Sequence, residues 1–460
     1  MAKQDTTITV KPCPRLEGEI ALPGDKSISH RAAIFNSLAE GKAEVRNFAP
    51  GKDCLATVSC LKALGVQISI KGPGNLLISG TGSNGLREAS DVLDAHNSAT
   101  TMRLLSGLLS SQPFLSIVTG DASLRSRPMG RLIKPLQSMG GEIYGRGKDS
   151  FAPLVIRGGK LRGIEFVLPL PSAQVKSAIL LAGLSAQGKT VLHQPVPSRD
   201  HSERLLKRMG AQLESNGASI SLSPLTSPLS PLSLCIPGDI SSAAYFLVAG
   251  AIHPNARVII RNCGINPTRT GIIDALLAMG VRLRIENERL EADEPLADIV
   301  VESSELRGIE VAGDMIPRLI DEIPILAVAG SVAKGKTVIR GAAELRVKES
   351  DRIASVSQEL SKMGVEVEEL PDGVVIHGGR LLLGAEVDTH SDHRLAMSLA
   401  IAGLIAEGET TIKHAQIAQV SYPSFWQDLL SLQAEVLSRS SERSKEAAKE
   451  QRSSLIDFSD

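Results

Sequence analysis

The chain has 460 residues, of which 42% are hydrophobic, and this is enough apolar material for two or three domain-sized cores. Its 50 Lys and Arg residues balance 51 Asp and Glu residues, so the net charge of -1 argues against a global field that attracts nucleic acid or an anionic membrane. Five scattered cysteines without a CxxC pair argue against a disulfide framework or a zinc knuckle.

The first segment, MAKQDTTITVKPCPRLEGEI, has no apolar signal region and no Arg- or Ser-rich transit character. The longest apolar stretches, 243–252 and 395–406, fall short of the roughly 18 residues that a membrane-spanning helix needs. We therefore expect a cytoplasmic protein with no membrane or nucleic-acid partner, in which these stretches form buried helices.

One phrase recurs along the chain, an amphipathic helix that ends in Met-Gly or Leu-Gly and is followed by an alternating strand. The clear copies are LKALGVQISI, LQSMGGEIYG, LKRMGAQLES, LLAMGVRLRI and LSKMGVEVEE, and a degenerate copy is LLSLQAEVL. They recur about every 70 residues, a period too long for the common solenoid repeats. The pattern predicts six small α/β subdomains.

A second phrase precedes each copy and consists of a polar start, an Ala- and Leu-rich helix and a β-branched strand. Its six copies begin at Lys26, Asn97, Ser172, Asp239, Asp321 and Asp392. The helices, such as SAILLAGLSA and LAMSLAIAGLIA, are apolar on nearly every face, and this predicts burial at the centre of their domains.

The six units divide into two domains of three units each, with chain crossings near Pro23-Gly24 and Pro237-Gly238. One domain is predicted to comprise 1–23 and 237–437, because the opening strand TITVKP is assigned to the later half, and the other to comprise 24–236. The segment 438–460 is polar, charged and poor in apolar residues, and is predicted to be a solvated or disordered tail.

Cations stand near the start of several helices, where stability alone favours Asp or Glu because the helix N-terminus carries a partial positive charge. They are Lys26, Arg31, Arg103, Lys176 and Arg394 in the apolar helices, and Arg127, Arg199, Lys348 and Arg352 in the second helices. A single such residue is usually a solvated side chain, but recurrence in four of six repeats predicts an anion site. A substrate with several phosphate or carboxylate groups suits arginine forks.

Three short motifs suggest other functions, but their context argues against each. The segment 330–337, GSVAKGKT, matches the pattern GxxxxGK[ST], but a predicted helix precedes it and a strand follows, the reverse of a P-loop. The segment 80–85 matches GxGxxG without a following helix of dinucleotide-binding length. His390 and His393 have no matching ligand cluster for a metal and are expected to position Arg394.

Seven segments resemble, in order and spacing, signature motifs of the 5-enolpyruvylshikimate-3-phosphate (EPSP) synthase family. Between residues 22 and 423 they are LPGDKSISHR, LDAHNSATTMRLL, GDASLRSRPM, LPSAQVKSAILLAG, DEIPILAVA, ELRVKESDR and THSDHRLAM. The resemblance implies an α/β fold with two inside-out barrel domains, each with threefold pseudosymmetry, that close around substrates at their interface. The forms GDASLxxRPM and PSAQVKSA are similar to the subgroup called class II, many of whose members tolerate glyphosate.

The resemblance also implies an activity, that of a 3-phosphoshikimate 1-carboxyvinyltransferase. Such an enzyme moves the enolpyruvyl group of phosphoenolpyruvate to the 5-hydroxyl of shikimate 3-phosphate, in aromatic amino-acid (chorismate) biosynthesis, and releases phosphate. No step needs a metal or another cofactor. A monomer is expected, with these two substrates as ligands and glyphosate as a weak inhibitor.

The matching motifs carry over the family's site residues. Phosphoenolpyruvate would be bound by Lys26, Arg127, Arg352 and Arg394, beside Asn97, Ala99, Thr100, Arg103 and Gln174. Shikimate 3-phosphate would be bound by Lys26, Ser27, Arg31, Ser172, Ala173, Gln174, Arg199, Asp321 and Lys348. Lys26 would also belong to the catalytic set, in which Asp321 is the base at the 5-hydroxyl and Glu349 with Lys348 the acid pair at the methylene carbon. Crowded cations would lower the pKa of Lys348.

Three positions depart from common family patterns. His96 stands where many relatives have Gly, which leaves the local loop geometry open, and Val420 stands where some members have Lys. Ala99 stands where glyphosate-sensitive relatives usually have Gly. Because glyphosate is longer than phosphoenolpyruvate, the added methyl group is expected to obstruct the inhibitor and spare the substrate.

Two alternatives to this activity are open. UDP-N-acetylglucosamine enolpyruvyl transferase shares the fold, but its members carry Lys-Asn at the first motif and usually a Cys in a mobile loop, whereas this chain has Lys26-Ser27 and no Cys between 120 and 129. A non-catalytic repeat scaffold would not need Asp321, Lys348 and Glu349 beside so many cations.

Overall fold

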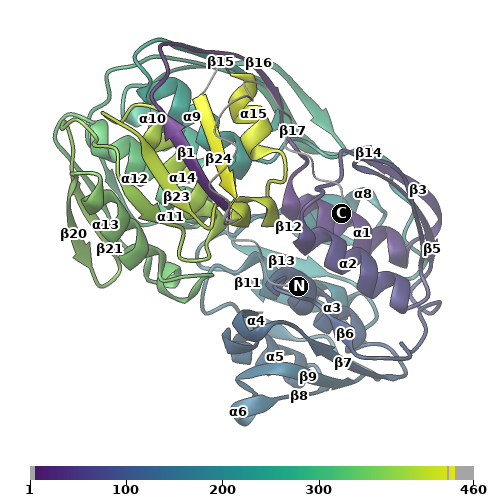
Figure 1. Ribbon diagram of the computed structural model, residues 1–460. Coiled ribbons are helices and arrows are strands. Elements are labelled where there is room, and N and C mark those ends of the chain that lie inside the picture. The colour runs from purple at the N-terminus through teal and green to yellow at the C-terminus, as the bar shows by residue number, and fades with distance from the viewer. Residues whose placement is uncertain (1–5, 433–434, 441–460) are drawn as a thin grey trace.

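The computed structural model describes residues 6–432 and 435–440, which form two lobes (Figure 1). One hydrophobic core gathers side chains between Ile28 and Ile236, and the other combines side chains between Ile8 and Leu22 with side chains between Ile240 and Leu432. The parts around these cores are called the first lobe (24–236) and the second lobe (6–23, 237–432 and 435–440).

The first lobe contains three four-stranded sheets among its described residues. In the order of hydrogen-bonded neighbours, the first sheet consists of β14 (Leu234–Cys235), β3 (Glu40–Arg46), β5 (Asn75–Thr81) and β4 (Gln67–Gly72). The second sheet consists of β6 (Leu93–Asp94), β7 (Leu115–Thr119), β9 (Phe151–Arg157) and β8 (Glu142–Gly145). The third sheet consists of β10 (Glu165–Val167), β11 (Thr190–His193), β13 (Ser219–Leu222) and β12 (Leu213–Ser215). In each sheet the first two strands are parallel and the other pairs are antiparallel.

The described part of the second lobe contains three further four-stranded sheets. They are β22 (Glu386–Asp388), β23 (Thr410–Lys413), β1 (Thr6–Lys11) and β24 (Glu435–Ser440); β16 (Arg282–Glu291), β17 (Glu294–Glu302), β15 (Ala256–Gly264) and β2 (Leu16–Ala21); and β18 (Glu310–Val311), β19 (Lys336–Ile339), β21 (Gly373–His377) and β20 (Glu366–Leu370). The strands β1 and β2 thus pair with partners from the distant second half of the chain.

The strand β24 differs from the sequence expectation for the C-terminal segment. It pairs antiparallel with β1 as far as Ser440, three residues into the predicted tail 438–460. The physical reason is that β1 offers unpaired backbone groups at that edge, which an extended segment can satisfy whatever its side chains. Residues 441–460 lie outside the described part of the chain.

Each central helix is buried along most of its length. The helices are α1 (Lys26–Leu38), α3 (Ala99–Leu109) and α7 (Ala173–Gly183) in the first lobe, and α9 (Ile240–Ile252), α12 (Ile323–Val332) and α14 (His393–Gly403) in the second. Side-chain oxygens cap five of them, from Asp25, Ser98, Ser172, Asp239 and Asp392. The near-uniform apolar character of these helices therefore predicted their burial correctly.

The second helices lie closer to the surface, and all except α15 end at the recurring glycine turns. They are α2 (Lys52–Ala63), α5 (Gly130–Ser138), α8 (His201–Arg208), α10 (Gly271–Ala278), α13 (Arg352–Lys362) and α15 (Phe425–Ser431). Gly65, Gly140, Gly210, Gly280 and Gly364 adopt φ between 84° and 96°, a left-handed conformation that only Gly adopts at low cost. The short helices are α4 (Ala122–Ser126), α6 (Arg146–Asp149), α11 (Met315–Leu319), η1 (Ile320–Glu322), η2 (Ala343–Val347) and η3 (Ala415–Val420).

A mixed α/β fold is therefore confirmed. The segment 330–337 runs from the end of α12 into β19, a helix-to-strand turn and not a P-loop. Within the described ranges, every helix is too short or too polar to cross a membrane.

The two lobes are joined where the chain crosses twice, side by side. Gly24 and Gly238 form an antiparallel bridge, and Asp25 N donates to Pro237 O at 2.8 Å. A Cβ atom at Gly24 would lie 1.8 Å from the backbone oxygen of Asn47, so the close approach requires glycine. The crossings bring the starts of α1 and α9 together, because Lys26 N donates to Asp239 Oδ2 at 3.2 Å.

Candidate active site

A cleft of about 1260 Å³ is lined by residues of both lobes. The first lobe contributes residues at the starts of α1, α3 and α7 and in the loop before α8. The second lobe contributes η1, η2 and the starts of α13 and α14. Since helix starts present unpaired N–H groups and a partial positive charge, the cleft suits an anionic ligand.

Nearly all the residues assigned from the sequence line this cleft. They are Lys26, Ser27, Asn97, Ala99, Thr100, Arg103, Arg127, Ser172, Ala173, Gln174, Arg199, Asp321, Lys348, Glu349, Arg352 and Arg394. Residues far apart in the sequence are thus brought to one surface, as the anion-site hypothesis requires.

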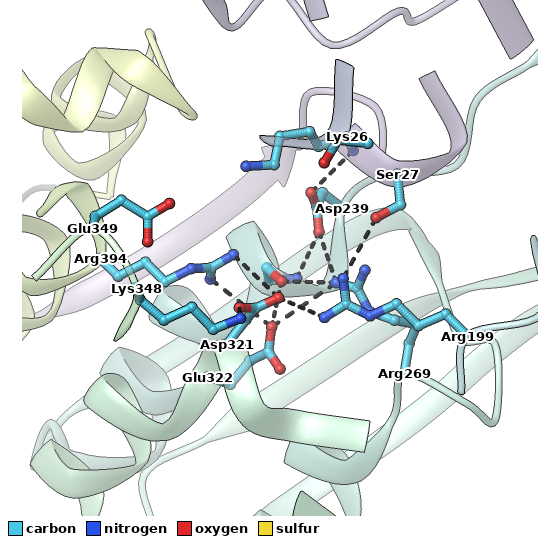
Figure 2. Close-up of polar contacts among 12 residues, drawn as sticks. Lys26, Ser27, Arg199, Asp239, Arg269, Asp321, Glu322, Lys348, Glu349 and Arg394 are labelled. Atoms are coloured by element: carbon cyan, nitrogen blue, oxygen red, sulfur yellow. Dashed lines mark hydrogen bonds and ion pairs between the residues drawn. The ribbon is translucent and has the colours of Figure 1, made fainter. Parts of the chain in front are cut away.

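The carboxylate of Asp321 lies among cations of both lobes (Figure 2). Its oxygens lie 2.5 Å from Arg199 Nη2, 3.6 Å from Arg352 Nη1, and 3.9 Å from both Lys348 Nζ and Arg394 Nη2. Burial alone would raise the pKa of Asp321, but these cations hold it well below its usual range. In this arrangement the carboxylate is therefore ionised and weakly basic.

A second carboxylate, that of Glu349, lies on the second-lobe wall and also meets a cation across the cleft. Its oxygens lie 2.6 Å from Arg352 Nη2 and 3.5 Å from Arg127 Nη1. Burial would raise the pKa of Glu349, but Arg352, His393, Arg127 and Lys26 hold it well below its usual range.

The two lysines of the site have opposite shifts. Burial lowers the pKa of Lys348, with Arg352 adding to the effect and Asp321 opposing it. The sequence therefore predicted the direction, while the larger cause is loss of solvent and not the crowding of cations. Burial would also lower the pKa of Lys26, but Asp53, 3.1 Å away, raises it.

On the first-lobe wall, a chain of hydrogen bonds orients the polar groups. Arg103 Nη1 donates to Gln174 Oε1 at 2.5 Å, and Gln174 Nε2 donates to Thr100 Oγ1 at 2.8 Å. Arg127 Nη2 donates to Asn97 Oδ1 at 2.8 Å. These bonds fix the cations and amides in place before a ligand arrives.

Comparison with known proteins identifies the family of this chain. The family model of EPSP synthase (3-phosphoshikimate 1-carboxyvinyltransferase) matches residues 10–429. This chain belongs to the EPSP synthase family. Proteins named 3-phosphoshikimate 1-carboxyvinyltransferase from Herpetosiphon aurantiacus and Desulforudis audaxviator are 53% and 51% identical to it, over 91% and 93% of this chain and 97% and 100% of theirs.

A solved structure of EPSP synthase from Acinetobacter baumannii is also similar, with a TM-score of 0.86 and 42% sequence identity. The match covers 94% of this chain and 100% of the Acinetobacter baumannii chain. The predicted enzyme class, 3-phosphoshikimate 1-carboxyvinyltransferase, is confirmed, and the two alternatives are disfavoured.

Unlike the other residues assigned a substrate contact, Arg31 does not line the cleft. It is 2% exposed, and its guanidinium donates to Ser27 O at 2.8 Å, to Ala173 O at 3.4 Å, and to the hydroxyls of Ser177 and Ser202 at 2.7 Å each. Burial lowers the pKa of Arg31 to about 10. It lies behind the wall and holds α1 against α7 and α8.

Lys176 corrects the sequence analysis, which grouped it with the anion-site cations. Its side chain is 0% exposed, and Nζ lies 2.7 Å from Glu203 Oε1 and 3.1 Å from Ser198 O. The prediction is wrong for this residue because Glu203 of α8 supplies a buried carboxylate that pairs with the ammonium, and Lys176 does not line the cleft.

Several charged residues of the site escaped the sequence analysis. Asp53, on α2, pairs with Lys26, and Arg131 Nη2 meets Glu344 Oε1 across the cleft at 3.0 Å. Glu344 lies within the matched ELRVKESDR segment, which was an available signal. Asp53 and Arg131 lie outside the matched segments. Their ion pairs with Lys26 and Glu344, respectively, form only in the folded chain.

The side chains of His96 and His390 each contact a nearby carboxylate. His96 adopts φ of 50°, and the carboxylate of Asp94 stabilises this turn by accepting from His96 N at 2.7 Å. His390 Nε2 lies 2.7 Å from Glu359 Oε1. In the described part of the chain, no group of three or more His, Cys, Asp or Glu residues is arranged to hold a metal ion.

Proposed function

We propose that the cleft joins phosphoenolpyruvate to the 5-hydroxyl of shikimate 3-phosphate, releasing phosphate and forming 5-enolpyruvylshikimate 3-phosphate. One observation carries this proposal: Asp321 of the second lobe meets Arg199 of the first lobe at 2.5 Å within a cleft otherwise rich in cations. A basic group and several anion-binding groups thus lie within reach of one pair of substrates.

The first lobe would bind shikimate 3-phosphate. Its phosphate and ring would contact Ser172, Ala173, Gln174 and Arg199, and its carboxylate would contact Ser27. The hydrogen bond from Arg199 Nη1 to Ser27 Oγ, 3.5 Å long, supports a shared position for these two side chains.

Arg31 would act on the substrate carboxylate either directly or through Ser27. To touch the substrate carboxylate directly, its guanidinium would have to exchange one of its present contacts with Ser27, Ala173, Ser177 and Ser202. Without that exchange it would act through the backbone of Ser27, which it already holds.

Phosphoenolpyruvate would lie where cations of the two lobes face each other. Its phosphate and carboxylate would be bound by Lys26, Arg127, Arg352 and Arg394, with Asn97, Ala99, Thr100 and Gln174 alongside. Charge-assisted contacts from arginine forks suit both anionic groups. Four cations would also stabilise the negative charge that develops on the departing phosphate.

The addition step would need one proton removed from the 5-hydroxyl and one proton delivered to phosphoenolpyruvate. The elimination step would need the reverse transfers. Asp321 would take the proton of the 5-hydroxyl as its oxygen bonds to C2 of phosphoenolpyruvate. The pair Glu349 and Lys348 would deliver a proton to the methylene carbon C3, and the Lys348 ammonium would be its source because the Glu349 carboxylate is ionised. The tetrahedral intermediate would then return the proton from C3 to the Glu349 and Lys348 pair and expel phosphate, which takes up the proton held by Asp321, so the C2–C3 double bond returns and both groups are restored.

Substrate binding would also prepare the base. Because Arg199 and Arg394 contribute to holding the pKa of Asp321 low, drawing their charge toward substrate anions would raise that pKa. Asp321 would thereby become a stronger base only in the loaded cleft, which couples binding to chemistry.

The proposal extends to glyphosate. Ala99 is the first residue of α3 and lines the cleft beside Thr100. A methyl group there would narrow the space for an inhibitor longer than phosphoenolpyruvate, giving the intrinsic tolerance associated with class II enzymes.

The architecture forms part of the same proposal. Two inside-out barrel domains, 24–236 and 1–23 with 237–437, would each be built around three buried helices, and closure of these domains would exclude water. The separate hydrophobic cores of the two lobes support this division. We also expect a cytoplasmic monomer.

The test is an assay of phosphate release from shikimate 3-phosphate and phosphoenolpyruvate, with UDP-N-acetylglucosamine as the competing acceptor. With phosphoenolpyruvate present, we expect phosphate release when shikimate 3-phosphate is the acceptor and none when UDP-N-acetylglucosamine is the acceptor. Release only with the nucleotide sugar, or with neither acceptor, would contradict the proposed function.

A further inference from the structure

Arg269 is a buried arginine beneath the cleft, in the loop between β15 and α10. It is 3% exposed, and its Nη1 lies 3.5 Å from Asp25 Oδ2 while its Nη2 lies 3.4 Å from Asp239 Oδ1. These carboxylates cap α1 and α9, the helices that follow the two chain crossings. One guanidinium therefore bridges both lobes at the base of the cleft.

The same guanidinium is connected to the turn that carries Asp321. Nη2 of Arg269 donates to Ser241 Oγ at 2.7 Å, and Ser241 Oγ donates to Glu322 Oε1. Glu322 directly follows Asp321 in η1 and lies 3.9 Å from Arg269 Nη2. Figure 2 shows Arg269 and Arg199 on the same side of this turn.

These contacts restrain η1 more firmly than a surface ion pair could. Glu322 is fully buried, and burial raises its pKa despite the nearby Arg269. A planar guanidinium can hold several oxygens at fixed angles, whereas a lysine ammonium supplies the charge without that geometry. Any shift of Glu322 moves the backbone of Asp321 with it.

We propose that Arg269 is a positioning residue: acting through Ser241 and Glu322, it fixes η1 so that the Asp321 carboxylate stands at the 5-hydroxyl of shikimate 3-phosphate. This inference rests on the proposed function of the cleft. Arg269 itself does not line the cleft, so the groups that bind substrate remain when it is replaced. The chemical step should slow more than binding weakens, because misplacement of a base by about 1 Å can cost roughly 100-fold in rate.

The test compares three variants with wild type, measuring kcat and the KM of each substrate. Arg269→Met should lower kcat by about 100-fold, and Ser241→Ala, which removes only the linking hydroxyl, by about tenfold. The kcat of Arg269→Lys should be about tenfold higher than the kcat of Arg269→Met. The KM values should stay within about threefold of wild type.

Arg261→Met is the matched control. Arg261 also meets two carboxylates, Glu19 at 2.7 Å and Asp298 at 2.9 Å, but it lies on the surface away from the cleft. Its replacement should leave kcat within about twofold of wild type, as an exposed ion pair contributes little.

The outcomes separate this inference from the proposed function. An inactive wild-type enzyme contradicts the function itself, whereas an active wild type with unchanged kcat in Arg269→Lys and Ser241→Ala contradicts only the positioning role. Higher KM with unchanged kcat also contradicts it. If thermal unfolding shows that Arg269→Met does not fold, the other two variants decide by the same criteria.

Discussion

The base of the cleft and its walls both join cations and carboxylates from the two lobes, yet they differ in access. At the base, Arg269 is enclosed, so a ligand cannot reach it to replace its partners Asp25, Asp239 and Glu322. On the walls, Arg199 meets Asp321 in a cavity that a ligand can enter. Enclosed ion pairs fix geometry, whereas ion pairs on a cavity wall can exchange partners with a substrate.

Electrostatics alone does not distinguish the two regions. Burial would raise the pKa of Asp25 and of Asp321, and in each case nearby arginines lower it instead. What differs is the presence of space for a competing anion, which only the walls provide. The comparison therefore predicts that wall substitutions change catalysis or ligand affinity in residue-specific ways.

The largest effect is expected from removing the charge of the wall carboxylates. Asp321→Asn and Glu349→Gln should each lower kcat by at least about 100-fold and change the KM values far less, because each removes a proton-transfer group. Steady-state kinetics with both substrates checks this. A raised KM with intact kcat would show that these carboxylates only bind.

Removing a wall cation should have the next largest effect. Lys26→Ala, Arg127→Ala or Arg394→Ala should lower kcat/KM for phosphoenolpyruvate by at least about tenfold, since a charge-assisted contact contributes ~1.5–3 kcal/mol. Lys334→Ala is the control, because Lys334 pairs with Glu305 on the exposed surface. Equal kinetics in control and wall variants would refute the anion site.

A change in shape without a change in charge gives a selective effect. Ala99→Gly should tighten glyphosate inhibition by at least about tenfold, the equivalent of ~1.4 kcal/mol, while the affinity for phosphoenolpyruvate changes little. Inhibition constants of both forms, measured at matched phosphoenolpyruvate saturation, check this. A sensitive parent enzyme would remove Ala99 as the discriminating contact.

The smallest effect is expected for the wall pair whose members have no assigned substrate contact. Glu344→Gln breaks the pair with Arg131, in which the side chains are 30% and 22% exposed. Because neither member is assigned a substrate contact and both side chains still meet solvent in the cleft, kcat/KM should change by less than about fivefold. A loss comparable to that of Arg127→Ala would instead give this pair a role in catalysis or closure.

The sequence was sufficient to predict the central helices and the cleft residues. The apolar helices and their polar starts are local features, so the caps Ser172 and Asp392 and the burial of α7 and α14 followed from pattern alone. The left-handed turns at Gly65 and Gly364 were marked by the repeated Met-Gly and Leu-Gly phrases.

The remaining features depend on partners that the sequence does not place. Lys176 resembles a site cation until Glu203 is known to face it. The four acceptors of Arg31 come from three different helices, which the sequence does not bring together. Arg269 has no motif of its own, because its role arises from carboxylates at three distant positions. Long-range charge pairing is therefore what the sequence analysis could not supply.

The most direct test of the central claim, that wall ion pairs exchange partners with substrate, is a crystal structure of the enzyme with shikimate 3-phosphate. Arg199 Nη2 and Asp321 Oδ2, 2.5 Å apart in the present structure, should separate beyond about 4 Å, with the guanidinium on the substrate phosphate. An occupied cleft in which Arg199 still contacts Asp321 at its present distance would contradict the account.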